Sequence, residues 1–323
     1  MAINQRKAAV IGCGFVGASI AFSLMQRGLF SELVLIDANH RKAEGEAMDL
    51  SHGLPYAASM EIYAGTYADA ADCALAIVTA GANQKPGETR LDLIGRNVSI
   101  LGSILPQLTA SGFEGLLLIV SNPVDVLTYA AQRISGFPKE RVLGSGTVLD
   151  TARLKYELGR HLGVDSRSIH AVIIGEHGDS ELAVWSGANV SGIDLNHFCE
   201  LRGHFDHEGA MRSIYEAVRG SAYEIIERKG ATYYGIAMAV ARIAECIVKD
   251  EHAVLPVSVQ PSGAYGLDGL ALSLPAVVGA GGVETVLEIP LSSAEREALL
   301  ASAAQLHEVL DTLSLPGLTP ALS

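Results

Sequence analysis

The sequence AAVIGCGFVG, residues 8–17, runs from an apolar β-branched segment into a glycine-rich turn. The turn matches the pattern G-x-G-x-x-G with the residues Gly12, Cys13, Gly14, Phe15, Val16 and Gly17. In this pattern Gly12 allows a tight turn, Gly14 lets the backbone approach a pyrophosphate, and Gly17 permits close packing of helix on strand. The phosphates would lie over the N-terminus of the following helix, where free N–H groups and the helix dipole favour an anion.

Asp37 strengthens the case for a dinucleotide site, because the hexapeptide alone is weak evidence. It ends the next strand-like run, 20 residues after Gly17, where an acid can accept both ribose hydroxyls. Its carboxylate would repel a 2′-phosphate and no Arg follows it directly, so NAD is favoured over NADP. The alternative is an ordinary strand-end acid that caps a turn. We expect the cofactor to contact Gly12, Gly14, Phe15, Val16, Gly17 and Asp37.

The surrounding sequence predicts an α/β fold of the Rossmann type, with a doubly wound parallel sheet. Short apolar runs alternate with longer helical patterns, and parallel strands need such crossover helices. The strand-like runs are 8–12, 33–37, 74–80, 116–120 and 141–144. The helical stretches between them lie near 16–28, 41–52, 94–110 and 124–134.

The pattern changes after about residue 147, which predicts an NAD-binding domain over 1–145 and a mixed α+β substrate domain over 146–323. The second part predicts a helix at 148–163, a strand running into a loop at 170–178, and a long helical region at 206–250 that Gly230 interrupts. Two hairpins over 254–289, a helix from Ser292 or Ser293 with Glu295 and Glu297 in its first turn, and a loose tail complete the prediction.

Composition excludes several classes of protein. The 36 acidic residues outnumber the 23 basic ones, which argues against a nucleic-acid partner. The longest apolar runs fall short of the ~18 residues of a membrane span, and the first residues do not look like a signal peptide. The four cysteines show no CxxC spacing, so neither a metal site nor a disulfide scaffold is expected. A cytoplasmic protein remains.

Three segments carry the candidate catalytic residues. Arg90 follows an irregular Pro-Gly loop after the strand at 74–80, and Asp150 and Arg153 are three apart in a predicted helix. His177 lies in the segment GEHGDS, between glycines after an apolar strand. The alternatives are a surface Arg, an intrahelical salt bridge and a structural His. Together, a His, an Asp partner and two Arg residues beside a dinucleotide site predict hydride transfer.

With these residues in view, the chain resembles the lactate and malate dehydrogenase family over nearly its whole length. Beyond the glycine turn and Asp37, the resemblance rests on SNPVD at 121–125, GSGTVLDTAR at 144–153, GEHGDS at 175–180 and KGATYYGIA at 229–237. It implies NAD as cofactor and a reversible reduction of a 2-oxo acid, as in the fermentative step that follows glycolysis.

The resemblance also assigns roles to individual residues. His177 would be the proton donor and acceptor, Asp150 its orienting partner, Arg153 the anchor of the substrate carboxylate, and Arg90 the lid residue that polarises the carbonyl. Three further residues would line the site: Asn122 near substrate and nicotinamide, Thr232 at the substrate pocket and Ile236 at the nicotinamide. Capping for the first and helix packing for the other two are the alternatives.

Gln84 favours the L-lactate branch of the family over the malate branch. Malate enzymes carry Arg at this lid position to pair the second carboxylate of oxaloacetate, whereas neutral Gln84 suits the methyl group of pyruvate. Malate dehydrogenase or another 2-hydroxy acid dehydrogenase stays the alternative. A non-catalytic NAD sensor is a remote one, because it would not need His177, Asp150, Arg153 and Arg90 together.

The resemblance further suggests a homotetramer activated by fructose 1,6-bisphosphate. In many bacterial members a basic residue two positions after the anchoring Arg and a His seven before the catalytic His bind this effector between subunits. Lys155 and His170 occupy these places. The alternatives are a solvated helix residue and a strand-start residue.

Overall fold

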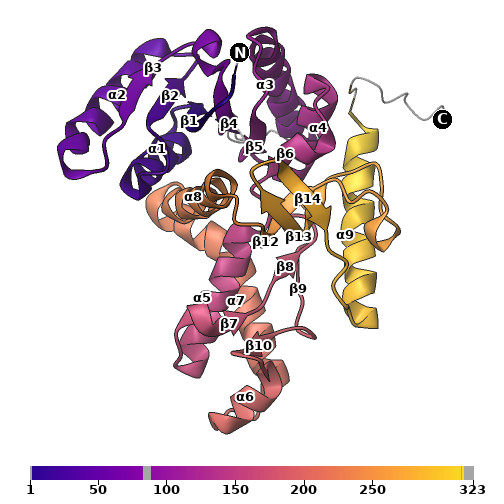
Figure 1. Cartoon of the computed structure of the whole chain (residues 1–323). Helices are drawn as coiled ribbons and strands as arrows, with labels where there is room; N and C mark the ends of the chain where they lie inside the picture. Colours follow the sequence, from indigo (N-terminus) through magenta and orange to yellow (C-terminus); the bar gives the residue numbers. More distant parts are fainter. Residues whose placement is uncertain (1, 83–88, 314, 316–323) are drawn as a thin grey trace.

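The computed structural model describes residues 2–82, 89–313 and 315 of the 323-residue chain. Its main feature is a nine-stranded sheet within those residues (Figure 1). In order across the sheet, the strands are β14 (Gly282–Val286), β13 (Leu272–Gly279), β12 (Ala253–Val259), β6 (Val142–Gly144), β5 (Leu116–Ile119), β4 (Cys73–Val78), β1 (Asn4–Ile11), β2 (Glu32–Ile36) and β3 (Glu61–Ala64).

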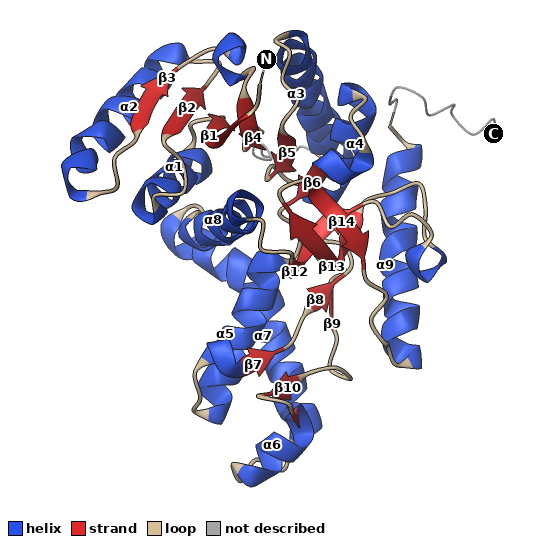
Figure 2. Ribbon diagram, in the orientation of Figure 1, coloured by secondary structure: helices blue, strands red, loops and turns tan. Residues whose placement is uncertain are grey.

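The six strands from β6 to β3 pair in parallel, as the alternation of strands and helices predicts. Helices cover both sides of this part of the sheet, and every residue of β4 and β5 is buried (Figure 2). On one side lie α1 (Phe15–Arg27) and α2 (His40–Gly53), and on the other lie α3 (Arg90–Ala110) and α4 (Val124–Ser135). The predicted Rossmann-type fold is confirmed.

The antiparallel strands of the second half extend the same sheet. Ser258 of β12 pairs with Gly144 of β6, so the sheet continues past residue 145. Gly144 permits this approach, because a Cβ there would lie 2.3 Å from the Thr128 hydroxyl oxygen and 2.8 Å from the Ser258 Cβ. The prediction of two hairpins over 254–289 was wrong in part. Only β13 and β14 form a tight hairpin, and β12 pairs with β13 across a longer connection.

The second half also contributes helices that pack below the sheet in Figure 1. The predicted helical region at 206–250 is two helices, and its break lies at Gly230, which has φ +84°. The predicted strand at 170–178 is broken into β7 and β8. The bounds are α5 (Val148–Leu162), β7 (Ile169–His170), β8 (Ile173–Ile174), β9 (Leu182–Ala183), β10 (Asn189–Val190), β11 (Ile193–Asp194), α6 (Leu195–Leu201), α7 (His207–Lys229), α8 (Tyr234–Lys249) and α9 (Ser293–Asp311).

Helix α9 begins as its sequence predicts. The Ser292 hydroxyl accepts the Glu295 N–H, and the Glu295 carboxylate accepts the Ser292 N–H in return. The predicted tail lies outside the described residues except for Leu315. No helix of the described chain is long and apolar enough to cross a membrane.

Candidate active site

The glycine turn joins β1 to α1, and its three glycines serve different needs. Gly12 has φ +103°, and its N–H donates to the Ile36 carbonyl at 2.7 Å. A Cβ at Gly12 would lie 2.6 Å from the Ala80 nitrogen, and one at Gly17 would lie 1.9 Å from the Gly12 carbonyl oxygen. A Cβ at Gly14 would meet nothing within 4 Å. The fold therefore requires Gly12 and Gly17, whereas Gly14 leaves the backbone open to a ligand at the N-terminus of α1.

Asp37 ties the turn to the end of β2. Its carboxylate accepts the Cys13 N–H at 2.7 Å and the Asn39 N–H at 2.8 Å. A carboxylate has about four lone-pair positions, so it retains acceptors for ribose hydroxyls. The turn-capping role considered above is present, and the residue also fits an NAD ribose. Phe15 at the start of α1 is 73% exposed, with its ring centroid 5.5 Å from that of Tyr233.

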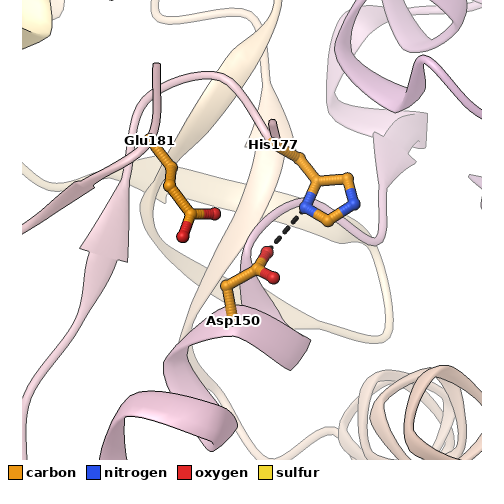
Figure 3. A group of neighbouring side chains, drawn as sticks. All are labelled: Asp150, His177 and Glu181. Atoms are coloured by element: carbon orange, nitrogen blue, oxygen red, sulfur yellow. Dashed lines mark hydrogen bonds and ion pairs between the residues drawn. The ribbon is translucent and has the colours of Figure 1, made fainter. Parts of the chain in front are cut away.

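Two of the catalytic candidates, Asp150 and His177, meet where α5 faces the loop after β8 (Figure 3). The His177 N–H donates to Asp125 Oδ2 at 2.7 Å, which fixes the backbone of the loop. The ring Nδ1 of His177 lies 2.6 Å from Asp150 Oδ2. Gly175 and Gly178 flank the histidine with φ of +91° and +156°, values that L side chains rarely adopt.

Asp150 is shared between His177 and Arg153. Its side chain is 3% exposed, its Oδ2 contacts the imidazole, and its Oδ1 accepts from Arg153 Nη1 at 2.7 Å. From the sequence, Asp150 and Arg153 could form an intrahelical salt bridge or could each contact a different target. The structure has the salt bridge and the contact to His177 at once, so Asp150 serves both partners.

The charge of Asp150 decides the protonation of His177. Burial disfavours a charged imidazole, but the attraction of Asp150 and its hydrogen bond outweigh burial and raise the pKa of His177 to about 9. Burial of Asp150 is likewise outweighed, mainly by the His177 charge, and the pKa of Asp150 lies below its ordinary value. At neutral pH the pair is therefore an imidazolium and a carboxylate. His177 then donates from Nδ1 to Asp150 and keeps a proton on Nε2.

Two buried acids next to this pair, Asp125 and Glu181, were not predicted from the sequence. Asp125 is 1% exposed, and its Oδ1 accepts the Ser258 hydroxyl at 2.6 Å while Oδ2 holds the His177 N–H. Its only signal was its place in SNPVD, to which no role was given. Glu181 is 5% exposed and directly precedes β9. The only sequence signal for Glu181 was that an acid stands at the start of an apolar run.

Asp150, His177 and Glu181 each offer a donor atom, and these atoms lie within 4.8 Å of one another. Three such donors are a set that a divalent cation accepts. The hydrogen bond between His177 and Asp150, by contrast, is the arrangement that an orienting acid and a catalytic imidazole require. We therefore interpret His177 and Asp150 as an acid–base pair.

The other predicted pocket residues come from three elements. Asn122 is exposed just before α4, and its carbonyl oxygen accepts from Asn97 Nδ2 at 2.8 Å. Thr232 lies partly buried between α7 and α8, and Ile236 in the first turn of α8 packs against the main core. A packing role for Ile236 is thus present, and its contact with the nicotinamide stays a prediction.

The two predicted lid residues, Arg90 and Gln84, lie at and beyond an edge of the described chain. Arg90 begins α3, whose first turn is capped by the Thr89 hydroxyl accepting the Asp92 N–H at 3.1 Å, but the Arg90 side chain is not described. Gln84 lies outside the described residues. Their roles stay predictions.

The two predicted effector residues line one hollow of about 950 Å³. Lys155 from α5 and His170 from β7 share its wall with Arg242 of α8. Burial lowers the pKa of the Lys155 ammonium. Arg242 is engaged by Glu251 at 2.5 Å, whereas Lys155 has no ion-pair partner in the part of the chain that the structure describes.

Known proteins are similar to this chain over nearly its whole length. Residues 6–144 match the lactate/malate dehydrogenase NAD binding domain, and residues 147–314 match the alpha/beta C-terminal domain of the same family. An L-lactate dehydrogenase of Moorella thermoacetica is 53% identical over 310 residues, which are 96% of this chain and 98% of that protein. One of Acetivibrio thermocellus is 48% identical, with the same coverage.

Solved structures agree with these relatives. The minor L-lactate dehydrogenase of Enterococcus mundtii, in its ligand-bound form, has a TM-score of 0.94 and 44% identity, and the match covers 97% of this chain and 100% of that one. The predictions of this family, of an NAD-dependent oxidoreductase and of the lactate branch over the malate branch are confirmed.

Proposed function

The chain belongs to the lactate/malate dehydrogenase family, and we propose that it catalyses the reversible, NADH-dependent reduction of pyruvate to L-lactate. The relatives above carry the L-lactate name, which supports lactate over malate. The observation that carries the proposal is the 2.6 Å contact between His177 Nδ1 and Asp150, because it leaves a charged imidazole ready to donate a proton.

When bound, NADH supplies a hydride to the carbonyl carbon of the substrate. His177 gives its Nε2 proton to the carbonyl oxygen, and Asp150 stabilises the imidazolium and fixes its orientation. Arg153 holds the substrate carboxylate, and Arg90 stabilises charge on the carbonyl oxygen, an effect of roughly 3 kcal/mol per donor in other enzymes. Asn122 and Thr232 complete the pocket.

Gln84 sets the choice of substrate in this proposal. Specificity constants with NADH for pyruvate, oxaloacetate and 2-oxobutyrate test it, and we expect pyruvate to be preferred. Gln84→Arg would shift the preference toward oxaloacetate by roughly 2–3 kcal/mol, because the pocket gains a partner for the second carboxylate. A wild-type enzyme that prefers oxaloacetate to pyruvate would overturn the assignment.

We also propose a cytoplasmic homotetramer. Three large apolar side chains on adjacent helices support association: Phe22 of α1 is 50% exposed, Met48 of α2 62% and Met238 of α8 54%. The Ser23 hydroxyl lies 3.5 Å from the Met238 sulfur, which places the α1 and α8 contributions side by side. Sedimentation equilibrium measures the assembly.

Activation by fructose 1,6-bisphosphate is the finer part of the proposal. The hollow with Lys155, His170 and Arg242 supports it, because a phosphate needs clustered cations in an otherwise acidic protein. The test is the pyruvate saturation curve with and without the bisphosphate, at enzyme concentrations low enough for dissociation. Lys155→Ala should abolish the response, and Lys139→Ala, an exposed lysine elsewhere, should not. Superimposable wild-type curves would leave Lys155 and His170 as surface residues.

A further inference from the structure

Glu181 is a buried acid that the steps above do not use. Its side chain converges with those of Asp150 and His177 (Figure 3). One ring nitrogen or carboxylate oxygen of each residue lies within 4.8 Å of the others. Its Oε1 is buried and has no hydrogen-bond partner. A negative charge on a buried carboxylate oxygen that accepts no hydrogen bond is costly, so this site favours the protonated, neutral form of Glu181.

The groups that face Glu181 come from three elements. Helix α5 contributes the charges of Asp150 and Arg153, the loop before β9 contributes His177, and α7 contributes Tyr215 and Arg219.

The two donors of α7, Tyr215 and Arg219, bond to backbone carbonyls and not to the Glu181 carboxyl group. The Tyr215 hydroxyl donates to the backbone carbonyl of Glu181, and Arg219 donates to the Asp179 carbonyl at 2.7 Å. Arg153 donates to Asp150. The cations nearby therefore attract a charge on Glu181 only through space.

Burial and the neighbouring Asp150 charge raise the pKa of Glu181 to about 8. Glu181 is then mostly neutral at pH 7 and charged at pH 9. His177 titrates in a similar range, with its pKa at about 9, and the charges of Asp125 and then Glu181 add to the attraction of Asp150 that holds its proton. Two groups this close titrate as a coupled pair.

We propose that Glu181 is a titratable positioning residue whose ionisation keeps His177 protonated in alkaline solution. As pH rises, Glu181 releases its proton to solvent, and its new charge joins that of Asp150 beside the imidazolium. Pyruvate reduction, which needs protonated His177, thereby extends to higher pH. The inference rests on the proposed role of His177 as proton donor.

The test is the pH profile of kcat/KM for pyruvate in Glu181→Gln, which keeps the shape of the side chain and cannot ionise. Below pH 7 we expect values within about twofold of wild type, because Glu181 is neutral there. The alkaline decline should move down by about one pH unit, the size of shift that a nearby charge produces. The profile for lactate oxidation, which needs neutral His177, should also move to lower pH.

Two further variants complete the design. Glu181→Asp restores an ionisable group and should recover part of the alkaline activity, and it serves as the second test should the Gln variant not fold. Asp165→Asn removes a charge from an exposed position and should leave the profile unchanged. An alkaline decline unmoved in Glu181→Gln, or a loss equal at every pH, would overturn the inference.

Failure of the proposed function would look different. His177→Gln would then retain proton-coupled turnover, whatever the profile of the Glu181 variants.

Discussion

The glycine turn with Asp37 and the cluster of Asp125, Asp150 and His177 each contain an acid that accepts a backbone N–H at 2.7 Å, but the two are assembled differently. Asp37 accepts from Cys13, 24 residues earlier, within one strand–turn–helix–strand unit. Asp125 accepts from His177, 52 residues later, and from Ser258, 133 residues later. The contact that holds the glycine turn is thus local, whereas the cluster around His177 forms only after three distant segments have packed together.

The burial of the two acids follows from this difference. Asp37 is only partly buried and retains free acceptors, so it can meet a ligand. Asp125 is 1% exposed, and burial raises its pKa to about 6, although its hydrogen bonds to Ser258 and His177 oppose the shift. Substitutions in the first region should therefore change cofactor binding, and those in the second should change chemistry and stability.

The largest expected effect separates the two regions. His177→Ala should lower the rate of hydride transfer by roughly 10³-fold, within the range for loss of a general acid. NADH affinity should stay within twofold of wild type, because the glycine turn and Asp37 are unchanged. Single-turnover absorbance and NADH fluorescence titration measure the two quantities. A parallel loss of NADH affinity would show that the regions are not independent.

The catalytic pair should also make stability depend on pH. The folded-state pKa of His177 lies above its unfolded value, so its contribution is fully present below about pH 6.5 and is lost as pH rises through about 9. We expect the loss of this contribution to lower the free energy of unfolding by roughly 3 kcal/mol over this interval, and Glu181, whose pKa is raised to about 8, adds to the decline in its lower part. Urea unfolding at fixed protein concentration measures it. The same decline in His177→Gln would assign it to other groups.

A matched pair of glycines tests the cofactor turn. Gly17→Ala places a Cβ 1.9 Å from the Gly12 carbonyl oxygen and should cost roughly 1–3 kcal/mol of stability. Gly14→Ala meets open space, so stability should change by less than about 0.5 kcal/mol while NADH binding weakens. Thermal unfolding and NADH titration distinguish them. Normal NADH affinity in Gly14→Ala would mean that the cofactor does not approach this backbone.

The smallest effect is expected at Asp37. Asp37→Ser keeps a short acceptor for the Cys13 N–H and removes the charge that repels a 2′-phosphate. The preference for NADH over NADPH should fall by roughly tenfold, or about 1.4 kcal/mol. Ratios of kcat/KM for the two cofactors measure it. Equal use of both cofactors by the wild-type enzyme would contradict the assignment.

The same contrast separates what could be predicted from sequence. The strand, the turn and the helix of residues 8–37 could be predicted, because each is indicated by neighbours in the chain. The roles of Asp125 and Glu181 could not be predicted in this way. Nothing near Asp125 in sequence indicates the Ser258 hydroxyl, and an acid before an apolar run is as compatible with a surface turn as with burial.

By itself, then, the sequence determined the Rossmann-type half and NAD as cofactor, and it predicted the part that Asp37 plays in this preference and the set of catalytic side chains. It did not determine the edge strand β3, whose four residues are too short to show a pattern, or the continuation of the sheet through Ser258 and Gly144. Those features, and the sharing of Asp150 between His177 and Arg153, were decided by tertiary structure. Strand pairing and the protonation of buried side chains depend on which distant groups lie beside them and exclude water. Those neighbours are set only once the chain is packed.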